Sequence, residues 1–213
     1  SNMISYSEAL LLIAREATVQ PVLRVDCNES LGKVAAEEVK SYLNIPPFNN
    51  SAMDGFALQA ITTVGATHIS PKRIKVTNCL AAGDILENAN QNFAVEIMTG
   101  AKLPKVFDAV VPIEKVRVIP DANGHAVEIE IHSEINSGQN VRYTGEDFCC
   151  GSSLATMGTR LHAGHIAAMA ATGVHNVLVF NMPEVEVLTT GKEVSDTYHA
   201  TLKDGEIYNS NTP

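Results

Sequence analysis

The chain has 213 residues, of which 45% are hydrophobic, so it is long enough for one or two globular domains with real cores. Its 24 acidic and 15 basic side chains give a formal net charge of -9, which opposes attraction to the phosphates of nucleic acid. We therefore expect no nucleic-acid partner. A negatively charged small molecule would have to be held by local groups that act against this overall charge.

The N-terminal region carries no targeting signal. Its apolar run ends at Arg15 and Glu16, well short of the roughly 18 residues that suggest a membrane helix. It also lacks the basic region and cleavage site of a secretory signal, so we expect no membrane partner and a cytoplasmic location. Ser1 and Asn2, before Met3, resemble the remnant of an expression tag, and we leave them out of the fold prediction.

The four cysteines show no C-x-x-C spacing. The adjacent pair Cys149 and Cys150 is a poor disulfide, because neighbouring side chains rarely meet in the required geometry. We expect four reduced, structural thiols: Cys27, Cys79, Cys149 and Cys150.

The first predicted element is a helix that begins at Ser5. Ser5 and Glu8 have the spacing of a capping box, and an apolar stripe follows them. After Gly32 the periodicity does not decide between helix and strand, and we favour strand. Pro46 and Pro47 then force an extended segment, where a domain boundary is expected.

From about 48 to 141 the chain is expected to be mostly β, with short strands separated by turn residues. Val127, Ile129 and Ile131 alternate with polar residues, which is typical of a half-buried strand. Before Pro183 we expect a strand, and after it a buried strand at 184–188 and then a turn of small residues. The abrupt end of this last α/β pattern suggests a fragment or a missing partner.

A second helix is predicted over the alanine-rich segment that ends at Gly173, the position of a C-cap glycine. His162 and His165, at its start, are three residues apart and could share one face. A metal site needs a third ligand, and none is near in the sequence, so surface histidines are the better interpretation.

Four segments carry candidate chemistry. Residues 48–58 contain one carboxylate, Asp54, among asparagines and a serine; an Asp-Gly turn explains the glycine, but the polar groups exceed what a turn needs. Thr99-Gly100 is a strand end where a ligand could approach, although a plain turn is favoured. Glu146 and Asp147 fit a cation or acid-base site and a solvated loop equally well.

The fourth segment is the small polar turn from Thr189 to Gly191, which follows a predicted strand. In open α/β sheets ligands bind beyond the carboxyl ends of strands, where backbone N–H groups can face an anion. No Walker loop or G-x-G-x-x-G motif occurs, which argues against a generic nucleotide-binding α/β protein.

Taken together, these segments resemble the molybdopterin molybdenumtransferase family, the MoeA type that includes the E domain of gephyrin. The resemblance runs from Met3 to Pro213 but spans only the N-terminal half of the family's length. It is carried by PPFNNSAMDGFAL, EIMTGAKLP with DAVVPIE, NVRYTGEDF with GTRL, and VLTTGKEV with LKDGEIYNSN, in this order.

Family members insert molybdate into adenylyl-molybdopterin and release AMP, with magnesium (Mg²⁺) assisting. The resemblance implies an α+β multidomain fold: a discontinuous first domain (3–45 and 138–182), an inserted β-rich domain (46–137), and the start of an α/β molybdopterin-binding domain (183–213). It also implies a homodimer with its active cleft between subunits, and the molybdopterin adenylyltransferase as a further partner.

Motif by motif, the resemblance assigns catalytic roles to Asp54, Thr99, Asp147 and Glu193. A carboxylate on a turn with small neighbours can bind Mg²⁺ or orient the leaving adenylate, but which acids touch the metal stays open. The expected substrate-binding residues are neighbours of these four: Ser51, Met53, Gly55, Gly100, Glu146, Thr190 and Gly191.

Two departures from the family pattern affect this interpretation. Lys192 stands where an acidic or small polar residue is usual, which alters the local charge. The chain also ends before the pterin-holding loop of the third domain, so we do not expect it to catalyse the reaction alone. The alternative is a non-catalytic dimeric scaffold derived from the same family, although a scaffold has no evident need for all four catalytic residues.

Overall fold

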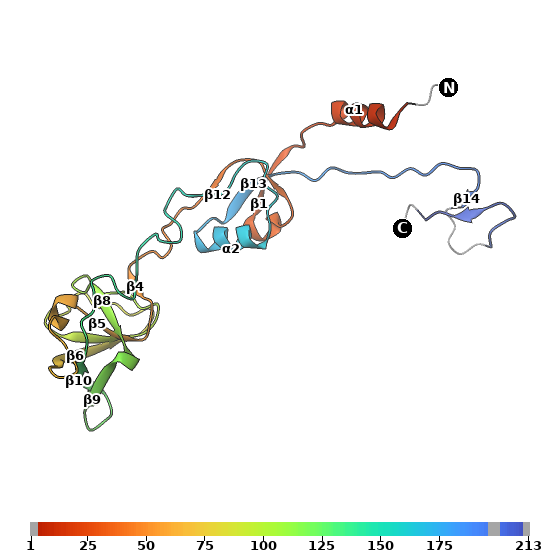
Figure 1. The fold of residues 1–213 in the computed structure, drawn as a ribbon. Coiled ribbons are helices and arrows are strands. Elements are labelled where there is room, and N and C mark those ends of the chain that lie inside the picture. Colours follow the sequence, from red (N-terminus) through yellow and green to blue (C-terminus); the bar gives the residue numbers. More distant parts are fainter. Residues whose placement is uncertain (1–3, 196–200, 211–213) are drawn as a thin grey trace. The chain divides into compact units, whose positions relative to one another are not determined.

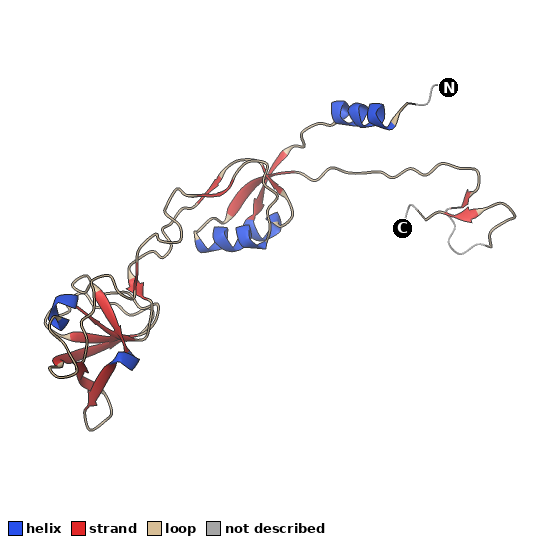
Figure 2. Cartoon of the chain, viewed as in Figure 1, coloured by secondary structure: helices blue, strands red, loops and turns tan. Residues whose placement is uncertain are grey.

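The structure, a computed structural model, describes residues 4–195 and 201–210 (Figure 1). The chain divides into two compact units, Arg24–Val179 and a second unit made of Ser1–Leu23 with Phe180–Pro213. Strands outnumber helices throughout the described residues (Figure 2). Neither α-helix in this part of the chain is long and apolar enough for a membrane crossing.

Helix α1 (Tyr6–Glu16) is the predicted N-terminal helix. Ser5 Oγ accepts a hydrogen bond from the Glu8 N–H (3.2 Å), and the Glu8 carboxylate accepts one from the Ser5 N–H (2.7 Å). This confirms the capping box, which satisfies two N–H groups that have no partner within the helix. The helix has no buried residue, and its apolar side chains from Leu10 to Ile13 are all exposed.

A small sheet and one helix make up part of the larger unit. Strands β1 (Val22–Asp26), β13 (Asn176–Phe180) and β2 (Val34–Ala35) lie in the order β1-β13-β2. Helix α2 (Ala163–Ala171) and the 3₁₀ helix η1 (Cys27–Ser30) accompany them. The buried residues of this part are Cys27, Ala35, Val39, Ala155, Leu161, Met169, Val174, Val177 and Val179.

Both ends of α2 follow the sequence prediction. His162 Nδ1 accepts a hydrogen bond from the Gly164 N–H (3.1 Å), and His165 Nδ1 accepts one from the His162 N–H (3.2 Å), so the two histidines cap the helix start. Gly173 has φ +81° just beyond the C-cap residue Thr172, the left-handed conformation that glycine adopts without a steric penalty.

A six-stranded mixed sheet dominates the middle of the chain, as predicted. The β6 and β7 strands are parallel, and the other neighbours are antiparallel. Its order is β8-β5-β7-β6-β10-β9, formed by β5 (Gly55–Leu58), β6 (Lys72–Leu80), β7 (Ala94–Ile97), β8 (Ala109–Pro112), β9 (Val116–Pro120) and β10 (Ala126–Ile131). The 3₁₀ helices η2 (Ala60–Thr63) and η3 (Ile113–Lys115) lie in its connections.

This sheet has a hydrophobic cluster on each face. Phe56 and Leu58 belong to one cluster, whereas Ala57 between them belongs to the other. Because successive side chains of a strand point to opposite faces, β5 contributes to both cores at once. Apolar burial on two faces explains why β5 and β8 are buried at every position.

Three two-stranded ladders complete the fold. β4 (Asn50–Ser51) pairs with β11 (Val141–Arg142) and β3 (Val39–Lys40) with β12 (Ser153–Ala155), both antiparallel. In the other unit β14 (Val194–Ser195) pairs with β15 (Ile207–Tyr208) in parallel. The strands β2 and β3 confirm the preference for strand after Gly32.

The four cysteines are free, as predicted. Cys27 is buried in the core beside α2, whereas Cys79, Cys149 and Cys150 are exposed.

Two strand predictions were wrong in detail. Residues 184–188 form no strand, and Val185, Val187 and Leu188 are exposed, because no described element pairs with this segment or covers it. In β10, Ile129 and Ile131 are buried as expected, but Val127 is 42% exposed, and Glu130, which the alternation places on the polar face, is buried. The register against β9 shifts between Ala126 and Glu128, and this bulge turns Val127 outward.

Candidate functional site

The candidate site starts at Asp54, in the turn between β4 and β5. Asp54 Oδ1 accepts a hydrogen bond from the Thr99 N–H (2.7 Å) and a second from the Thr99 hydroxyl (2.8 Å). These bonds, the backbone one first, lower the pKa of Asp54. Because the side chain is also exposed, the turn presents an ionised carboxylate to solvent in a fixed orientation.

The backbone of Ser51 connects the turn that carries Asp54 to the turn that contains Thr99 and Gly100. Its N–H donates to the Ala101 carbonyl (3.0 Å), and its own carbonyl accepts from the Gly100 N–H (2.8 Å). The Ser51 hydroxyl is buried and hydrogen-bonds the backbone of Met53. Ser51 and Gly100 therefore position Asp54 and Thr99, while Met53 lies exposed beside them.

Gly55 has a separate structural reason to be glycine. It pairs with Pro112 where β5 meets β8, and a Cβ at this position would clash with the Val111 carbonyl oxygen. The Asp54 carbonyl also accepts a hydrogen bond from the Ile113 N–H (3.1 Å). The Asp-Gly pair therefore holds the carboxylate beside a position where the backbones of β5 and β8 leave no room for a Cβ.

A second cluster surrounds Arg142. Its Nε donates to Glu146 Oε1 (2.6 Å), and its Nη2 donates to both carboxylate oxygens of Asp147 (2.8 and 2.7 Å). The hydrogen bond from Arg142, followed by one from the Tyr143 N–H, lowers the pKa of Glu146. The two acids, first Glu146 and then Asp147, raise the pKa of Arg142. In this structure both carboxylates are thus paired with one guanidinium.

The β4–β11 ladder connects the two clusters and also separates their carboxylates. Ser51 pairs with Val141, and Asn49 Oδ1 accepts hydrogen bonds from the N–H (2.9 Å) and hydroxyl (3.1 Å) of Thr144. The two strands run in opposite directions. The chain that continues from β4 to Asp54 therefore leaves the ladder at one end, and the chain that continues from β11 to Asp147 leaves it at the opposite end.

The remaining predicted residues, Glu193, Thr190 and Gly191, belong to the other unit. The Glu193 carbonyl accepts a hydrogen bond from the Ile207 N–H (2.7 Å), which joins the turn to β15. The Glu193 carboxylate lies against Gly191, where a Cβ would meet Oε1 at 2.6 Å. Thr190 is exposed on the same turn.

The sequence prediction assigned no site role to two residues that organise the site. Arg142 balances the charge of Glu146 and Asp147, and Asn49 ties the first segment to the third. The sequence did contain a signal for Arg142, since it precedes the two acids by four and five positions. No group of three His, Cys, Asp or Glu side chains among residues 4–195 and 201–210 is arranged to hold a metal ion.

Known proteins resemble this chain in sequence. The molybdopterin molybdenumtransferase of Staphylococcus aureus (strain MRSA252) is 32% identical over 213 residues, which cover 100% of this chain and 49% of the relative. The enzyme of the same name from Bacillus subtilis (strain 168) is 36% identical over 188 residues, covering 88% and 43%. The chain thus spans about half the length of the curated relatives that it matches.

Solved structures agree with these sequence matches. The crystal structure of the molybdopterin biosynthesis MoeA protein from Pyrococcus horikoshii OT3 matches with a TM-score of 0.86 and 29% identity, covering 99% of this chain and 55% of that one. A second MoeA structure from Pyrococcus matches with a TM-score of 0.78 and 33% identity, covering 99% and 52%. The family profile "MoeA N-terminal region (domain I and II)" matches residues 4–173, and the chain therefore belongs to the MoeA family.

Proposed function

We propose that this chain is part of a molybdopterin molybdenumtransferase, which acts in molybdenum cofactor biosynthesis by inserting molybdate into adenylyl-molybdopterin and releasing AMP. The names of its relatives support this role. The observation that carries the proposal is the pairing of Asp54 with Thr99, 45 positions apart, through two hydrogen bonds to one carboxylate oxygen. Two of the motifs that carry the family resemblance thus lie on two exposed turns that these hydrogen bonds join.

The lowered pKa of Asp54 favours an electrostatic role over proton transfer. A general base works best when its pKa lies near the operating pH, and the hydrogen bonds from Thr99 move Asp54 further away from that range. A fixed negative charge instead suits the orientation of a cationic group or a hydrated metal ion near the reacting phosphates. Thr99 is then a positioning residue for Asp54.

Magnesium fits this arrangement through Asp54. Mg²⁺ in proteins usually keeps several waters and is bound by one or two carboxylates together with substrate phosphates. Asp54 is an exposed, ionised carboxylate of this kind, whereas Glu146 and Asp147 are already paired with Arg142. When bound, the ion would neutralise phosphate charge on the substrate and so limit its repulsion by nearby acids.

The Arg142 cluster has a complementary role in the proposal. A guanidinium held by two carboxylates is fixed in orientation. Its Nε and Nη2 already donate to Glu146 and Asp147, so Nη1 is the nitrogen that it would offer to an oxygen of a phosphate or of molybdate. Glu146 and Asp147 would act on the substrate through Arg142. Glu193, Thr190 and Gly191 would contribute from the turn after residue 188, where small residues leave backbone N–H groups accessible to an anion.

We also propose a homodimer in the cytoplasm. The exposed apolar side chains of α1, from Leu10 to Ile13, supply a surface that a second copy would cover. The molybdopterin adenylyltransferase, as the enzyme that supplies the adenylylated substrate, is the further partner expected. Sedimentation of the chain alone and mixed with that enzyme tests both associations.

The decisive experiment uses the complete protein, with adenylyl-molybdopterin, molybdate and Mg²⁺, and follows the release of AMP. Asp54→Asn should lower the rate by about 100-fold or more, since it removes a preorganised charge. Asp26→Asn is the matched control, because Asp26 caps η1 and asparagine caps equally well. Unchanged AMP release in Asp54→Asn would remove Asp54 from the reaction.

Isothermal titration with adenylyl-molybdopterin and Mg²⁺ separates the enzyme from the scaffold alternative. We expect binding by the complete protein and not by the 213-residue chain, because this chain spans only about half the length of the molybdenumtransferases that it matches. A complete protein that dimerises but neither binds this substrate nor releases AMP would support the scaffold instead.

A further inference from the structure

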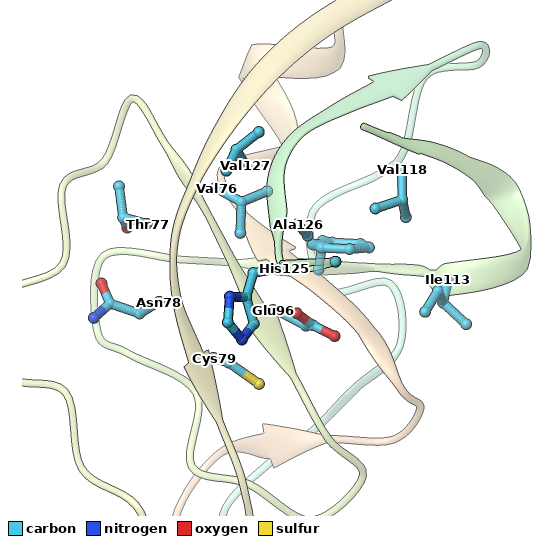
Figure 3. A pocket seen from close by; sticks show the side chains of 12 residues that line it. Val76, Thr77, Asn78, Cys79, Glu96, Ile113, Val118, His125, Ala126 and Val127 are labelled. Carbon is cyan, nitrogen blue, oxygen red and sulfur yellow. The ribbon is translucent and has the colours of Figure 1, made fainter. Parts of the chain in front are cut away.

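The six-stranded sheet carries a cavity of about 780 Å³ that is separate from the candidate site (Figure 3). Its volume falls within the range of roughly 300–1,000 Å³ typical of small-molecule pockets. It is bordered by β5, β6, β7, η3, β9 and β10, and no residue of the Asp54 or Arg142 clusters lines it.

Two irregularities of the sheet shape this cavity. β6 contains one extra residue relative to β7 between Val76 and Cys79, and β10 contains one relative to β9 between Ala126 and Glu128. Residues at both bulges line the cavity. A bulge bends its strand and redirects its side chains, and such bulges are frequent beside binding sites. The cavity therefore results from the irregular pairing of β6 with β7 and of β10 with β9.

The lining has an apolar part and a polar part. Val118 and Ile113 lie on one side, while Glu96, Cys79 and His125 gather on the other (Figure 3). Cys79 and Glu96 are paired positions on neighbouring strands, so their side chains belong to the same face of the sheet. Pockets that bind small molecules typically combine a mainly apolar wall with a few convergent polar groups.

The electrostatic character of the polar part is negative. Although Cys79 is exposed, partial desolvation raises the pKa of its thiol, and the charges of Glu96 and Asp84 raise it further, so this thiol adds no charge of its own. His125 Nδ1 lies 3.6 Å from Asp121 Oδ2, so the imidazole has a carboxylate beside it. Among the described residues that line the cavity there is no Lys or Arg. The net charge of -9 adds to the same field.

We propose that this cavity binds a small organic cation with an apolar body. The ammonium or amidinium group donates to the Glu96 carboxylate, and the body packs against Val76, Ile113 and Val118. Charge complementarity selects the cation, because a half-buried carboxylate needs a donor partner once a ligand displaces its water. The apolar wall selects against fully hydrated ions such as Mg²⁺.

Benzamidine is a suitable probe, because it joins a flat apolar ring to an amidinium. In the isotope-labelled 213-residue chain, its titration should shift the amide resonances of Thr77, Asn78 and Gly124 in a saturable way. Benzamide, which is neutral and of the same shape, should bind about tenfold or more weakly, since it lacks the charge-assisted bond. Benzoate should not bind.

Three variants assign the binding to the cavity. Glu96→Gln should weaken benzamidine binding about tenfold or more. Val127→Lys, at an exposed wall position, should abolish binding by adding a positive charge. Glu29→Gln, an exposed glutamate on η1, should leave the affinity unchanged. Circular dichroism and thermal melting confirm that each variant is folded.

Four results would overturn the proposal: no saturable shift, shifts confined to other residues, equal binding of benzamide, or unchanged affinity in Glu96→Gln. Titration with ZnCl₂ and MgCl₂ supplies a further comparison. If a metal ion shifted the same amides at lower concentration than benzamidine, the cavity would be a metal site and the organic-cation assignment would be wrong.

Discussion

Asp54 Oδ1 accepts both the N–H and the hydroxyl hydrogen of Thr99, at 2.7 and 2.8 Å, and so joins the turn after β4 to the end of β7. One oxygen atom thus fixes two loops that lie 45 positions apart in the chain. A carboxylate held in this way keeps its charge and its direction without being buried.

Thr99→Val should raise the pKa of Asp54 towards the ordinary value of about 3.9, because one of two hydrogen bonds to the ionised form is lost. The folded-state pKa of Asp54 is the lowered one. Its contribution to stability is therefore complete above the ordinary pKa and is lost as the pH falls through the folded value. Carboxyl resonances followed by NMR during a pH titration measure the shift.

Thr156→Val serves as the control, since its hydroxyl is exposed and hydrogen-bonds Thr159 in the same turn, away from Asp54. It should leave the Asp54 titration unchanged. If Thr99→Val also left it unchanged, the Thr99 hydroxyl would contribute nothing to the charge of Asp54.

Arg142→Gln should raise the pKa of Glu146, because the hydrogen bond from Arg142 is the largest cause of its lowering. The stability difference between the wild type and this variant should be greatest above the ordinary Glu pKa. It should shrink as the pH falls through the folded value, where Glu146 becomes protonated. Urea unfolding at several pH values measures it, with the exposed Arg24→Gln as control. A pH-independent difference would contradict the assignment.

Arg73→Met should destabilise the six-stranded sheet by about 2 kcal/mol, since it leaves a buried carboxylate with weaker partners. Glu130 is only 8% exposed at its side chain and lies 3.0 Å from Arg73, whereas Arg117 is 4.0 Å away. Chemical denaturation measures the change. Arg24→Met, at an exposed position, should change stability by less than about 0.5 kcal/mol. Equal losses of stability in the two variants would show that the ion pair between Arg73 and Glu130 does not stabilise the sheet.

Gly55→Ala should cost about 3 kcal/mol or more, because a Cβ there clashes with the Val111 carbonyl and must push β5 from β8. Gly83→Ala is the control, because alanine at this position introduces backbone strain without a steric clash. Gly83 has φ +98° but open space around it, so alanine should cost only about 1–2 kcal/mol. A comparable loss in both variants would mean that the strands separate easily at Gly55.

The sequence alone determined the elements whose partners are near in the chain. The capping box of Ser5 and Glu8 and the glycine after α2 depend on hydrogen bonds within a few residues, so their spacing was sufficient. Period-two alternation likewise predicted the burial of Ile129 and Ile131. It failed at Val127, where a one-residue shift against a neighbouring strand changes the exposed face.

The tertiary structure decided what depends on distant partners. It paired Asp54 with Thr99, assigned both Glu146 and Asp147 to Arg142, and directed Asp54 and Asp147 to opposite ends of the β4–β11 ladder. It also left residues 184–188 exposed, although their apolar pattern is that of a buried strand. The physical reason is that burial and ion pairing depend on which segments pack together, and long-range pairing is not encoded in the spacing of any one segment.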